Sequence, residues 1–408
     1  KGLKINSRSP ALLVNYATVL KKTNRFDEAL AAYSKALEIQ PDSADFYFNA
    51  IDTCERYNKI GKAKELLSSA KSVLNPLPDD LLLTESRLLV REKRHAEALL
   101  VLDKLNFSSA RSEVSIEALQ IKGTCEEKVG LYKQAFSTFS AMNALTMKSE
   151  RYAECDPEAY FDSAASDLMA LRDYDTQRHS NRLQKPSPRL AFLIGFPRSG
   201  TTLTDTILLA HPQIKIAEEG PAIASAKACF DSLGAFNFLH HRPGQTELEL
   251  GRAKYLETLH SIMEPTDNEV VIDKMPLNIL RIPLITALFP TAPLIVVVRH
   301  PLDSIFSCWT QNFSLNDAMA NMVSLDKICA LYDVCMETLM VAAEKLQPNI
   351  VLIKYESLLS DVKGEVAPAL NALGLSWDDN MEDHTAAARD RGFISTPSYS
   401  QVSQPLYM

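Results

Sequence analysis

A glycine-bounded loop at residues 195–202 carries the clearest chemical signal in the chain. It reads Gly-Phe-Pro-Arg-Ser-Gly-Thr-Thr and follows the apolar run Leu190–Ile194 directly. The amphipathic segment that starts at Thr201 predicts a helix after the loop. A strand, a tight turn and a helix N-terminus form an anion site, because backbone N–H groups converge there and the helix dipole adds partial positive charge. The sequence therefore predicts a phosphate-binding loop.

This loop differs from a nucleoside-triphosphate loop at one position. The glycine spacing matches GxxxxGK[ST], but Thr201 stands in place of the lysine. That lysine neutralises the β- and γ-phosphates in triphosphate enzymes. Arg198 supplies charge from inside the loop instead, which suits a donor with one phosphate and one sulfate. A turn that merely caps a helix is the alternative, but it would not need an arginine beside two threonine hydroxyls.

A second apolar run, Leu294–Val298, ends at Arg299. Pro301 favours a helix start there, because the N–H that proline lacks is not needed in a first turn. Arg299 at the strand end and Ser307 two turns into that helix can converge on one anion. An ion pair between Arg299 and Asp303 is the alternative interpretation.

Candidates for proton transfer and for stabilising a leaving group are found at two further apolar runs. Glu218 and Glu219 follow residues 214–216, and Lys274 ends a run that starts at Val270. A carboxylate can take a proton from an acceptor, and an ammonium can stabilise a departing phosphate. The alternatives are a solvated glutamate pair and a surface pair of Lys274 with Asp273. Further candidate bases are His240, His241 and His300.

The loop, with Leu203, the triplet Ala210-His-Pro212 and the pair of glutamates, resembles the start of the sulfotransferase family. The similarity is greatest to protein-tyrosine sulfotransferases and to bacterial sulfotransferases with tetratricopeptide repeats, and it covers about residues 190–407. It implies a three-layer α/β fold with a mostly parallel sheet and a P-loop-like phosphate site. It also implies 3′-phosphoadenosine 5′-phosphosulfate (PAPS) as co-substrate and 3′,5′-adenosine bisphosphate as product. No metal is expected.

The resemblance implies a role for several individual residues. Glu219 would be the catalytic base, Lys274 would bridge the departing phosphate and the sulfonate, and Arg198 would share leaving-group stabilisation. Arg299 and Ser307 would bind the 3′-phosphate. The expected nucleotide-binding residues are Pro197, Arg198, Ser199, Gly200, Thr201, Thr202, Arg299, Ser307, Tyr355 and Ser398.

The first 180 residues predict a different architecture, a helical solenoid. Small residues recur at Ala29, Ala63, Ala98 and Ala135, a period of 34 to 37 residues that is typical of tetratricopeptide repeats. A small side chain lets the two helices of a hairpin pack closely, and stacked hairpins bury a shared core. We expect four repeats, with a capping helix at residues 158–172 and a face that binds a peptide or protein. An ordinary helical bundle is the alternative.

The domain plan that follows has a repeat domain at 1–180, a linker at 181–189 and a sulfotransferase domain at 190–408. Strands are expected at residues 190–194, 270–272, 294–298 and 350–353. Their lack of charge indicates strands that are covered on both faces.

Composition narrows the class of protein. The chain has 408 residues, 46% of them hydrophobic, and a formal net charge of −8, which disfavours a general nucleic-acid binder. Seven cysteines without a CxxC pair favour a reducing compartment over a disulfide framework or a zinc site. Since no apolar run reaches the roughly 18 residues of a membrane span, we expect a cytoplasmic protein. The chain begins at Lys1, so it is also compatible with a fragment that has lost a targeting segment.

The function expected from the sequence is sulfuryl transfer from PAPS to an acceptor hydroxyl, with a protein tyrosine as one candidate acceptor. Two alternatives stay open. The acceptor can be a carbohydrate or a small molecule, or the chain can be a repeat scaffold whose second half binds nucleotide without turnover. Against the scaffold, all of the expected catalytic residues are present.

Overall fold

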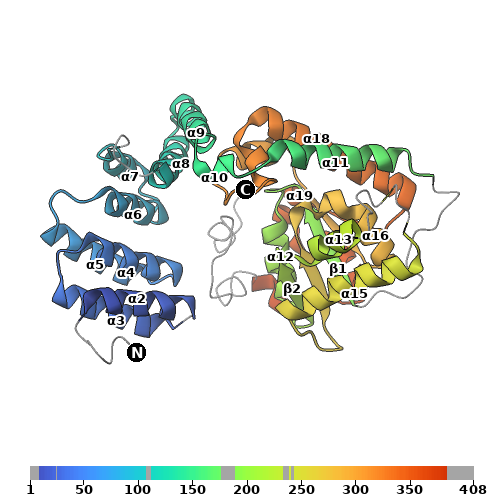
Figure 1. Cartoon of the computed structure of the whole chain (residues 1–408), viewed down its shortest axis with the longest axis horizontal. Helices are drawn as coiled ribbons and strands as arrows, with labels where there is room; N and C mark the ends of the chain where they lie inside the picture. The colour runs from blue at the N-terminus through green and yellow to red at the C-terminus, as the bar shows by residue number, and fades with distance from the viewer. Residues whose placement is uncertain are drawn as a thin grey trace. The chain divides into compact units, whose positions relative to one another are not determined.

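The computed structural model of the chain describes residues 9–23, 25–106, 112–175, 189–232, 239 and 243–383. Its contacts divide the chain into two compact units, a helical unit that runs to Ala153 and a unit with a sheet that starts at Glu154 (Figure 1). Each unit has its own hydrophobic core. The domain limits expected from the sequence stay predictions, and residues 181–188 of the expected linker lie outside the described residues.

The described part of the helical unit consists of four hairpins and a short final helix. Their helices are α2 (Pro10–Lys22), α3 (Phe26–Ile39), α4 (Ala44–Arg56), α5 (Ile60–Val73), α6 (Asp79–Arg91), α7 (His95–Leu102), α8 (Ser112–Lys128), α9 (Tyr132–Thr146) and α10 (Glu150–Ala153). Ala29, Ala63, Ala98 and Ala135 each occupy the fourth position of the second helix of a hairpin, and all four are buried. Stacked hairpins with a small residue at the closest approach are the predicted solenoid, which is therefore confirmed.

A parallel sheet lies at the centre of the second unit. Its five strands in the described residues are β1 (Leu190–Gly195), β2 (Ile214–Glu218), β3 (Val270–Lys274), β4 (Leu294–Val298) and β5 (Ile350–Lys354), in the order β2-β3-β1-β4-β5. All neighbouring strands pair in parallel, so all five end at the same edge. The three central strands are almost entirely buried, as expected for strands covered on both faces.

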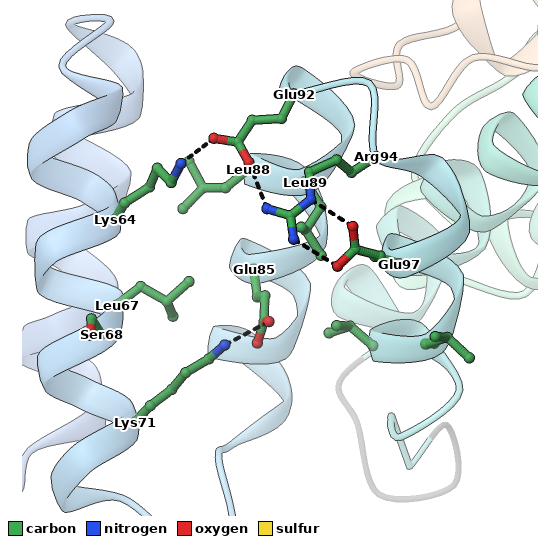
Figure 2. Close-up of a pocket in the computed structure, with 12 residues that line it drawn as sticks. Lys64, Leu67, Ser68, Lys71, Glu85, Leu88, Leu89, Glu92, Arg94 and Glu97 are labelled. Carbon is green, nitrogen blue, oxygen red and sulfur yellow. Dashed lines mark hydrogen bonds and ion pairs between the residues drawn. The ribbon is translucent and has the colours of Figure 1, made fainter.

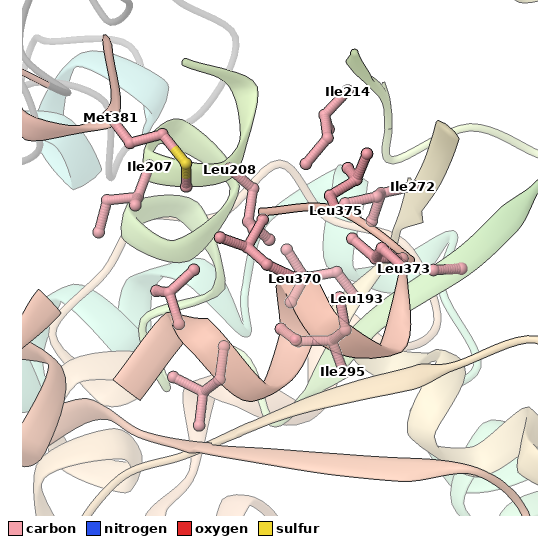
Figure 3. Packing of buried hydrophobic residues seen from close by; sticks show 14 of the residues in the cluster. Leu193, Ile207, Leu208, Ile214, Ile272, Ile295, Leu370, Leu373, Leu375 and Met381 are labelled. Carbon is pink, nitrogen blue, oxygen red and sulfur yellow. The ribbon is translucent and has the colours of Figure 1, made fainter. Parts of the chain in front are cut away.

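Helices cover both faces of this sheet and make three layers. Alternation along β1 shows this, because Leu193 belongs to the core beneath α12 (Thr201–Leu209) and α20 (Val362–Ala372) (Figure 3). Phe192 points to the other face and packs against Tyr255 and Phe289, with ring centroids 5.9 and 5.7 Å away. Tyr255 belongs to α15 (Gln245–Ile262), which contacts α16 (Ile282–Leu288). The predicted three-layer α/β fold is confirmed.

The remaining elements of this unit connect or flank the layers. They are α11 (Pro157–Arg172), α13 (Ala222–Ser232), η1 (Pro276–Arg281), α17 (Pro301–Trp309), η2 (Met319–Val323), α18 (Leu325–Leu346), α19 (Tyr355–Ser360) and η3 (Asp379–Asp383). Across the described ranges, no helix combines the length and the apolar character that a bilayer crossing requires.

Helix α11 was expected to cap the repeats, but it packs in the unit with the sheet. Arg172 pairs with Glu337 of α18 at 2.6 Å, and Lys327 of α18 pairs with Glu158 at 2.7 Å. The expectation of a cap on the repeats is therefore wrong for this helix. Apolar periodicity predicts a helix and its buried face, but it does not specify the neighbour that covers that face.

Candidate active site

The predicted site residues gather at the edge where the parallel strands end. Gly195, Glu218 and Lys274 are the last residues of β1, β2 and β3, while Arg299 and Tyr355 directly follow β4 and β5. After β1 the chain adds β2 and β3 on one side and then β4 and β5 on the other. Such a switch point, at the carboxyl ends of the strands, is where open α/β sheets bind ligands.

Both glycines of the loop are required by close contacts. A Cβ on Gly195 would lie 2.6 Å from the backbone oxygen of Val297. Gly200 has a φ of +108°, and a Cβ there would lie 2.3 Å from a ring carbon of Tyr355. The hydroxyl of Ser199 is buried and has no hydrogen-bond partner among the described residues. A buried polar atom usually has a partner, so this hydroxyl fits a bound polar group.

Two arginines meet beside the loop. Arg198 Nε donates a hydrogen bond to Ser307 Oγ at 3.0 Å, and Arg299 Nη1 donates to the backbone oxygen of Arg198 at 3.2 Å. The Arg299 guanidinium also lies over the Tyr355 ring, 4.6 Å from its centroid, at cation–π distance. Arg299 Nε and the Asp303 carboxylate are 4.0 Å apart, so the alternative ion pair is long. Residues predicted from two separate motifs are thus brought together.

Cys308, which the sequence analysis did not single out, donates a hydrogen bond to the phosphate-binding loop. Cys308, in α17, is fully buried and its thiol donates to the backbone oxygen of Pro197 at 3.3 Å. Burial raises the pKa of the Cys308 thiol to about 12, although the nearby Arg198 and Arg299 act in the opposite direction. The thiol therefore stays protonated at neutral pH and serves as a donor to the loop. One cysteine inside an apolar helix carries no sequence signal for this contact.

Lys274 lies at the centre of a cluster of carboxylates. Its Nζ is 3.0 Å from Glu218 Oε1, 3.0 Å from Glu219 Oε1 and 3.4 Å from Asp205 Oδ2. Burial disfavours the charged ammonium, but Asp205, Glu219 and Glu218 outweigh it, so the pKa of Lys274 is raised. A Lys274 ammonium is therefore fixed within reach of the predicted base.

Backbone strain marks two of the predicted catalytic residues. Among the described non-glycine residues with positive φ, Asn58, Lys93 and Gln347 stand at helix C-termini, where this conformation is common. Arg198, with φ of 67°, and Glu219, with φ of 49°, do not. Such strain costs about 1–3 kcal/mol per residue and clusters at functional sites. It supports the assignment of both residues to a site.

The alternative pairing of Lys274 with Asp273 is wrong. Successive residues of a strand point to opposite faces, so Asp273 turns away from Lys274 and accepts a hydrogen bond from Tyr255 Oη at 2.8 Å. Asp273 is also buried, which raises the pKa of its carboxyl to about 6, while the hydrogen bond from Tyr255 lowers it. The third carboxylate on Lys274 is Asp205 of α12, which the sequence interpretation did not single out.

Of the remaining candidate residues, His300 contacts Glu356, and three lie outside the described residues. The backbone N–H of His300 donates to Glu356 at 2.9 Å, and His300 itself is exposed. Ser398, His240 and His241 lie outside the described residues. Within the described ranges, no group of three or more His, Cys, Asp or Glu side chains has an arrangement that could hold a metal ion. The expectation of a metal-free reaction stays a prediction.

The helical unit has a pocket of its own, of about 410 Å³, between α5, α6 and α7 (Figure 2). Two ion pairs join α5 to the opposite wall: Lys71 pairs with Glu85 at 2.6 Å, and Lys64 pairs with Glu92. Arg94 pairs locally, with Glu97 at 2.6 Å and with Glu92 at 3.0 Å. The apolar side chains that line the pocket are Leu67, Leu88, Leu89, Leu100 and Val101. An apolar surface with a polar rim is typical of sites that bind a protein or another ligand.

Comparison with known proteins gives two family matches. Residues 191–379 match the model described as "Sulfotransferase family". Residues 17–50 match the model described as "TPR repeat". The first match contains the loop, the carboxylate cluster and Arg299. The second covers the end of α2, all of α3 and the first half of α4.

Two curated relatives agree with the sulfotransferase match. The chain is 26% identical over 250 residues to protein-tyrosine sulfotransferase 2 of Gallus gallus, covering 57% of this chain and 65% of that protein. It is 27% identical over 233 residues to protein-tyrosine sulfotransferase 1 of Danio rerio, covering 53% and 63%. The solved sulfotransferase domain of the Synechococcus PCC 7002 olefin synthase has 19% identity and a TM-score of 0.35, covering 53% of this chain and 84% of that one. The chain thus spans just under two thirds of the length of these two curated relatives.

Proposed function

We propose, from the premise that residues 191–379 form a domain of the sulfotransferase family, that this chain moves a sulfuryl group from PAPS to an acceptor hydroxyl. The observation that supports this proposal most is the convergence at one sheet edge of the loop, two arginines and the Lys274 carboxylate cluster. A donor that carries phosphates and a sulfate needs the first two features. Transfer to a hydroxyl needs the third.

The donor side of the site fits the phosphates of such a nucleotide. Backbone N–H groups at the start of α12 and the buried Ser199 hydroxyl would bind the 5′-phosphate in the loop. Arg299 would bind the 3′-phosphate together with Ser307, whose hydroxyl already accepts from Arg198. Tyr355 would hold the Arg299 guanidinium flat and in place. PAPS, when bound, supplies a sulfuryl group attached to a phosphate that can leave.

On the acceptor side, Glu219 would take the proton of the attacking hydroxyl. The acceptor oxygen then forms a bond to sulfur while the bond between sulfur and the phosphate oxygen breaks, so the negative charge moves onto that phosphate. Lys274 and Arg198 would stabilise this charge, which is how cations accelerate group transfer. The 3.0 Å contact between Lys274 Nζ and Glu219 Oε1 places base and cation side by side.

For the acceptor, we propose a tyrosine of a peptide or protein. The relatives named as protein-tyrosine sulfotransferases support this class, and a repeat domain with a charged, partly apolar pocket suits a peptide partner. A carbohydrate or a small molecule is the alternative acceptor. A non-catalytic scaffold is the alternative from a different class, and any turnover would exclude it.

The donor proposal is tested by calorimetry. Titration with 3′,5′-adenosine bisphosphate is expected to give tight binding, and titration with ATP little, because the loop lacks the lysine for a γ-phosphate. The reverse order of affinities would refute the proposed donor.

The acceptor proposal needs an activity measurement. Incubation with PAPS and matched peptides that carry tyrosine or phenylalanine at one position is expected to release 3′,5′-adenosine bisphosphate with the tyrosine peptide alone. Equal release with both peptides would argue against a tyrosine acceptor. Release with glycans but with neither peptide would favour the carbohydrate alternative.

A further inference from the structure

Asp205 is a carboxylate that no motif of the sequence accounts for. It lies in the second turn of α12, between Thr204 and Thr206, and has no exposed surface. Its Oδ2 is 3.4 Å from Nζ of Lys274, which is also fully buried. Burying a carboxylate is costly unless a cation compensates it, so a packed helix carries this aspartate for a reason that involves Lys274.

The three carboxylates on Lys274 differ in how firmly they are held. The side chain of Asp205 is 0% exposed, that of Glu218 is 29% exposed and that of Glu219 is 43% exposed. Asp205 projects from a helix that is packed on the sheet, whereas the two glutamates stand where β2 ends. Glu219 can therefore turn toward a substrate, and Asp205 cannot.

Catalysis requires Lys274 to change some of its partners. The cluster has one cation for three carboxylates, so approach of an anionic donor requires the ammonium to face the donor rather than Glu219. If the glutamates were its only anchors, Lys274 would lose its position whenever they moved. The buried partner supplies a fixed point.

We propose that Asp205 is a positioning residue that holds the Lys274 ammonium at the sheet edge while Glu219 and Glu218 exchange this contact for substrates. The proposal rests on the proposed roles of Lys274 and Glu219. In the described residues, the charged groups in contact with Lys274 Nζ are Asp205 from α12 and the two glutamates from the end of β2, because Asp273 faces the other way. The nearby anion favours the protonated lysine, in agreement with the raised pKa of Lys274.

Asp205→Asn keeps the size of the side chain and removes the charge. The kcat is expected to fall by about 10- to 100-fold, as for other groups that orient an active-site residue, while the affinity for 3′,5′-adenosine bisphosphate changes little. Loss of the anion lowers the pKa of Lys274, so the high-pH limb of the rate profile should move to lower pH. Asp205→Glu keeps the charge and should restore that limb.

A measurement that does not depend on turnover separates this proposal from the proposed function. NMR of protein labelled with ¹³C at lysine Cε follows the Lys274 titration, assigned by its absence in Lys274→Met. Asp205→Asn is expected to lower its midpoint by about one unit or more. Asp273→Asn is the matched control, because it removes a buried carboxylate from the opposite face and should leave the midpoint in place. An unchanged midpoint in Asp205→Asn would refute the proposal even if the wild type is a sulfotransferase.

Thermal stability gives a second test, which can be carried out even if the single variant Asp205→Asn is hard to obtain. Lys274→Met removes the cation from beside the buried Asp205 carboxylate, so its Tm is expected to fall. Adding Asp205→Asn to that variant is expected to recover part of the loss, because replacing both partners costs less than removing one. A double variant that melts below Lys274→Met would show that the two side chains are not coupled.

Discussion

The β2–β3 side and the β4–β5 side of the sheet edge have opposite balances of charge. On the first, the acidic side, three carboxylates surround the one ammonium of Lys274. On the second, the basic side, Arg198 and Arg299 contact a serine hydroxyl, a backbone oxygen and an aromatic ring, and the carboxylate of Asp303 is 4.0 Å from Arg299 Nε. The phosphate loop after β1 lies between them in the strand order.

This separation has a chemical use. A guanidinium beside the base would stabilise the carboxylate and weaken its basicity, and a carboxylate beside the phosphates would repel them. With the arginines on the other half of the sheet, Glu219 contacts the Lys274 ammonium, and the proposed exchange of that contact for substrate would free it to accept a proton. The phosphate loop lies between the two halves in the strand order, so Glu219 and the bound nucleotide would come together there.

The largest effect is expected from changing the acidic side with Glu219→Gln. The amide cannot take a proton, so kcat should fall by about 10²- to 10⁴-fold. The affinity for 3′,5′-adenosine bisphosphate, set by the basic side, should change by less than about threefold. The assay is PAPS turnover, with calorimetry for binding. Glu218→Gln is the matched control and should cost less; a larger loss in Glu218→Gln would move the base to Glu218.

Changing the basic side should mainly weaken binding of the nucleotide. Arg299→Ala is expected to weaken binding of 3′,5′-adenosine bisphosphate by about 10- to 100-fold, as for a lost hydrogen bond to a charged group. Binding of AMP, which lacks the 3′-phosphate, should change much less. Arg252→Ala is a control with another arginine over a ring, 5.4 Å from the Phe289 centroid, and calorimetry should show no effect. Equal losses for both nucleotides would remove Arg299 from the 3′-phosphate site.

Sequence reasoning anticipated the features that depend on local pattern. Strand runs without charge predicted β1 and β4, and the recurrence of alanines such as Ala29 and Ala63 predicted the hairpins, because both follow from regular periodicity. The loop was predictable since strand, glycines and helix are adjacent in the chain.

What the sequence did not predict depends on contacts between distant segments. Asp205 stands in a Thr-rich helix and has the appearance of a solvated residue, yet it is buried because Lys274, 69 positions later, faces it. A surface pair of Asp273 with Lys274 was the alternative interpretation, but the alternation of side chains along β3 separates the two. The helix α11 also depends on a partner, α18, that no local pattern specifies.

A smaller effect is expected on the pH dependence of stability. Asp273 and Lys274 lie on opposite faces of β3 and respond to pH in different ways. Burial raises the pKa of Asp273 from 3.8 to about 6, so the folded state binds its proton more tightly than the unfolded state. Stability from this group is therefore present at low pH and is lost as pH rises from about 4 to 6, by up to about 3 kcal/mol. Urea unfolding at pH 4.5 and 7 should show a smaller difference for Asp273→Asn than for the wild type. An identical pH dependence in both proteins would mean that Asp273 does not titrate in this range.

The smallest effect is expected beneath the loop, where Cys308 supports the basic side without touching a ligand. Cys308→Ala removes the thiol donor to Pro197 and should lower stability by about 1 kcal/mol, the usual net value of one hydrogen bond. Because Pro197 precedes Arg198, a loosened loop should also weaken 3′,5′-adenosine bisphosphate binding a few-fold, and Cys308→Ser, which retains a donor, should recover it. Cys335→Ala, at a fully buried cysteine of α18, controls for the loss of volume and should leave nucleotide affinity unchanged. If the affinity of Cys308→Ala equals that of the wild type, the loop keeps its shape without the thiol, and the basic side is built from Arg198, Arg299 and Ser307 alone.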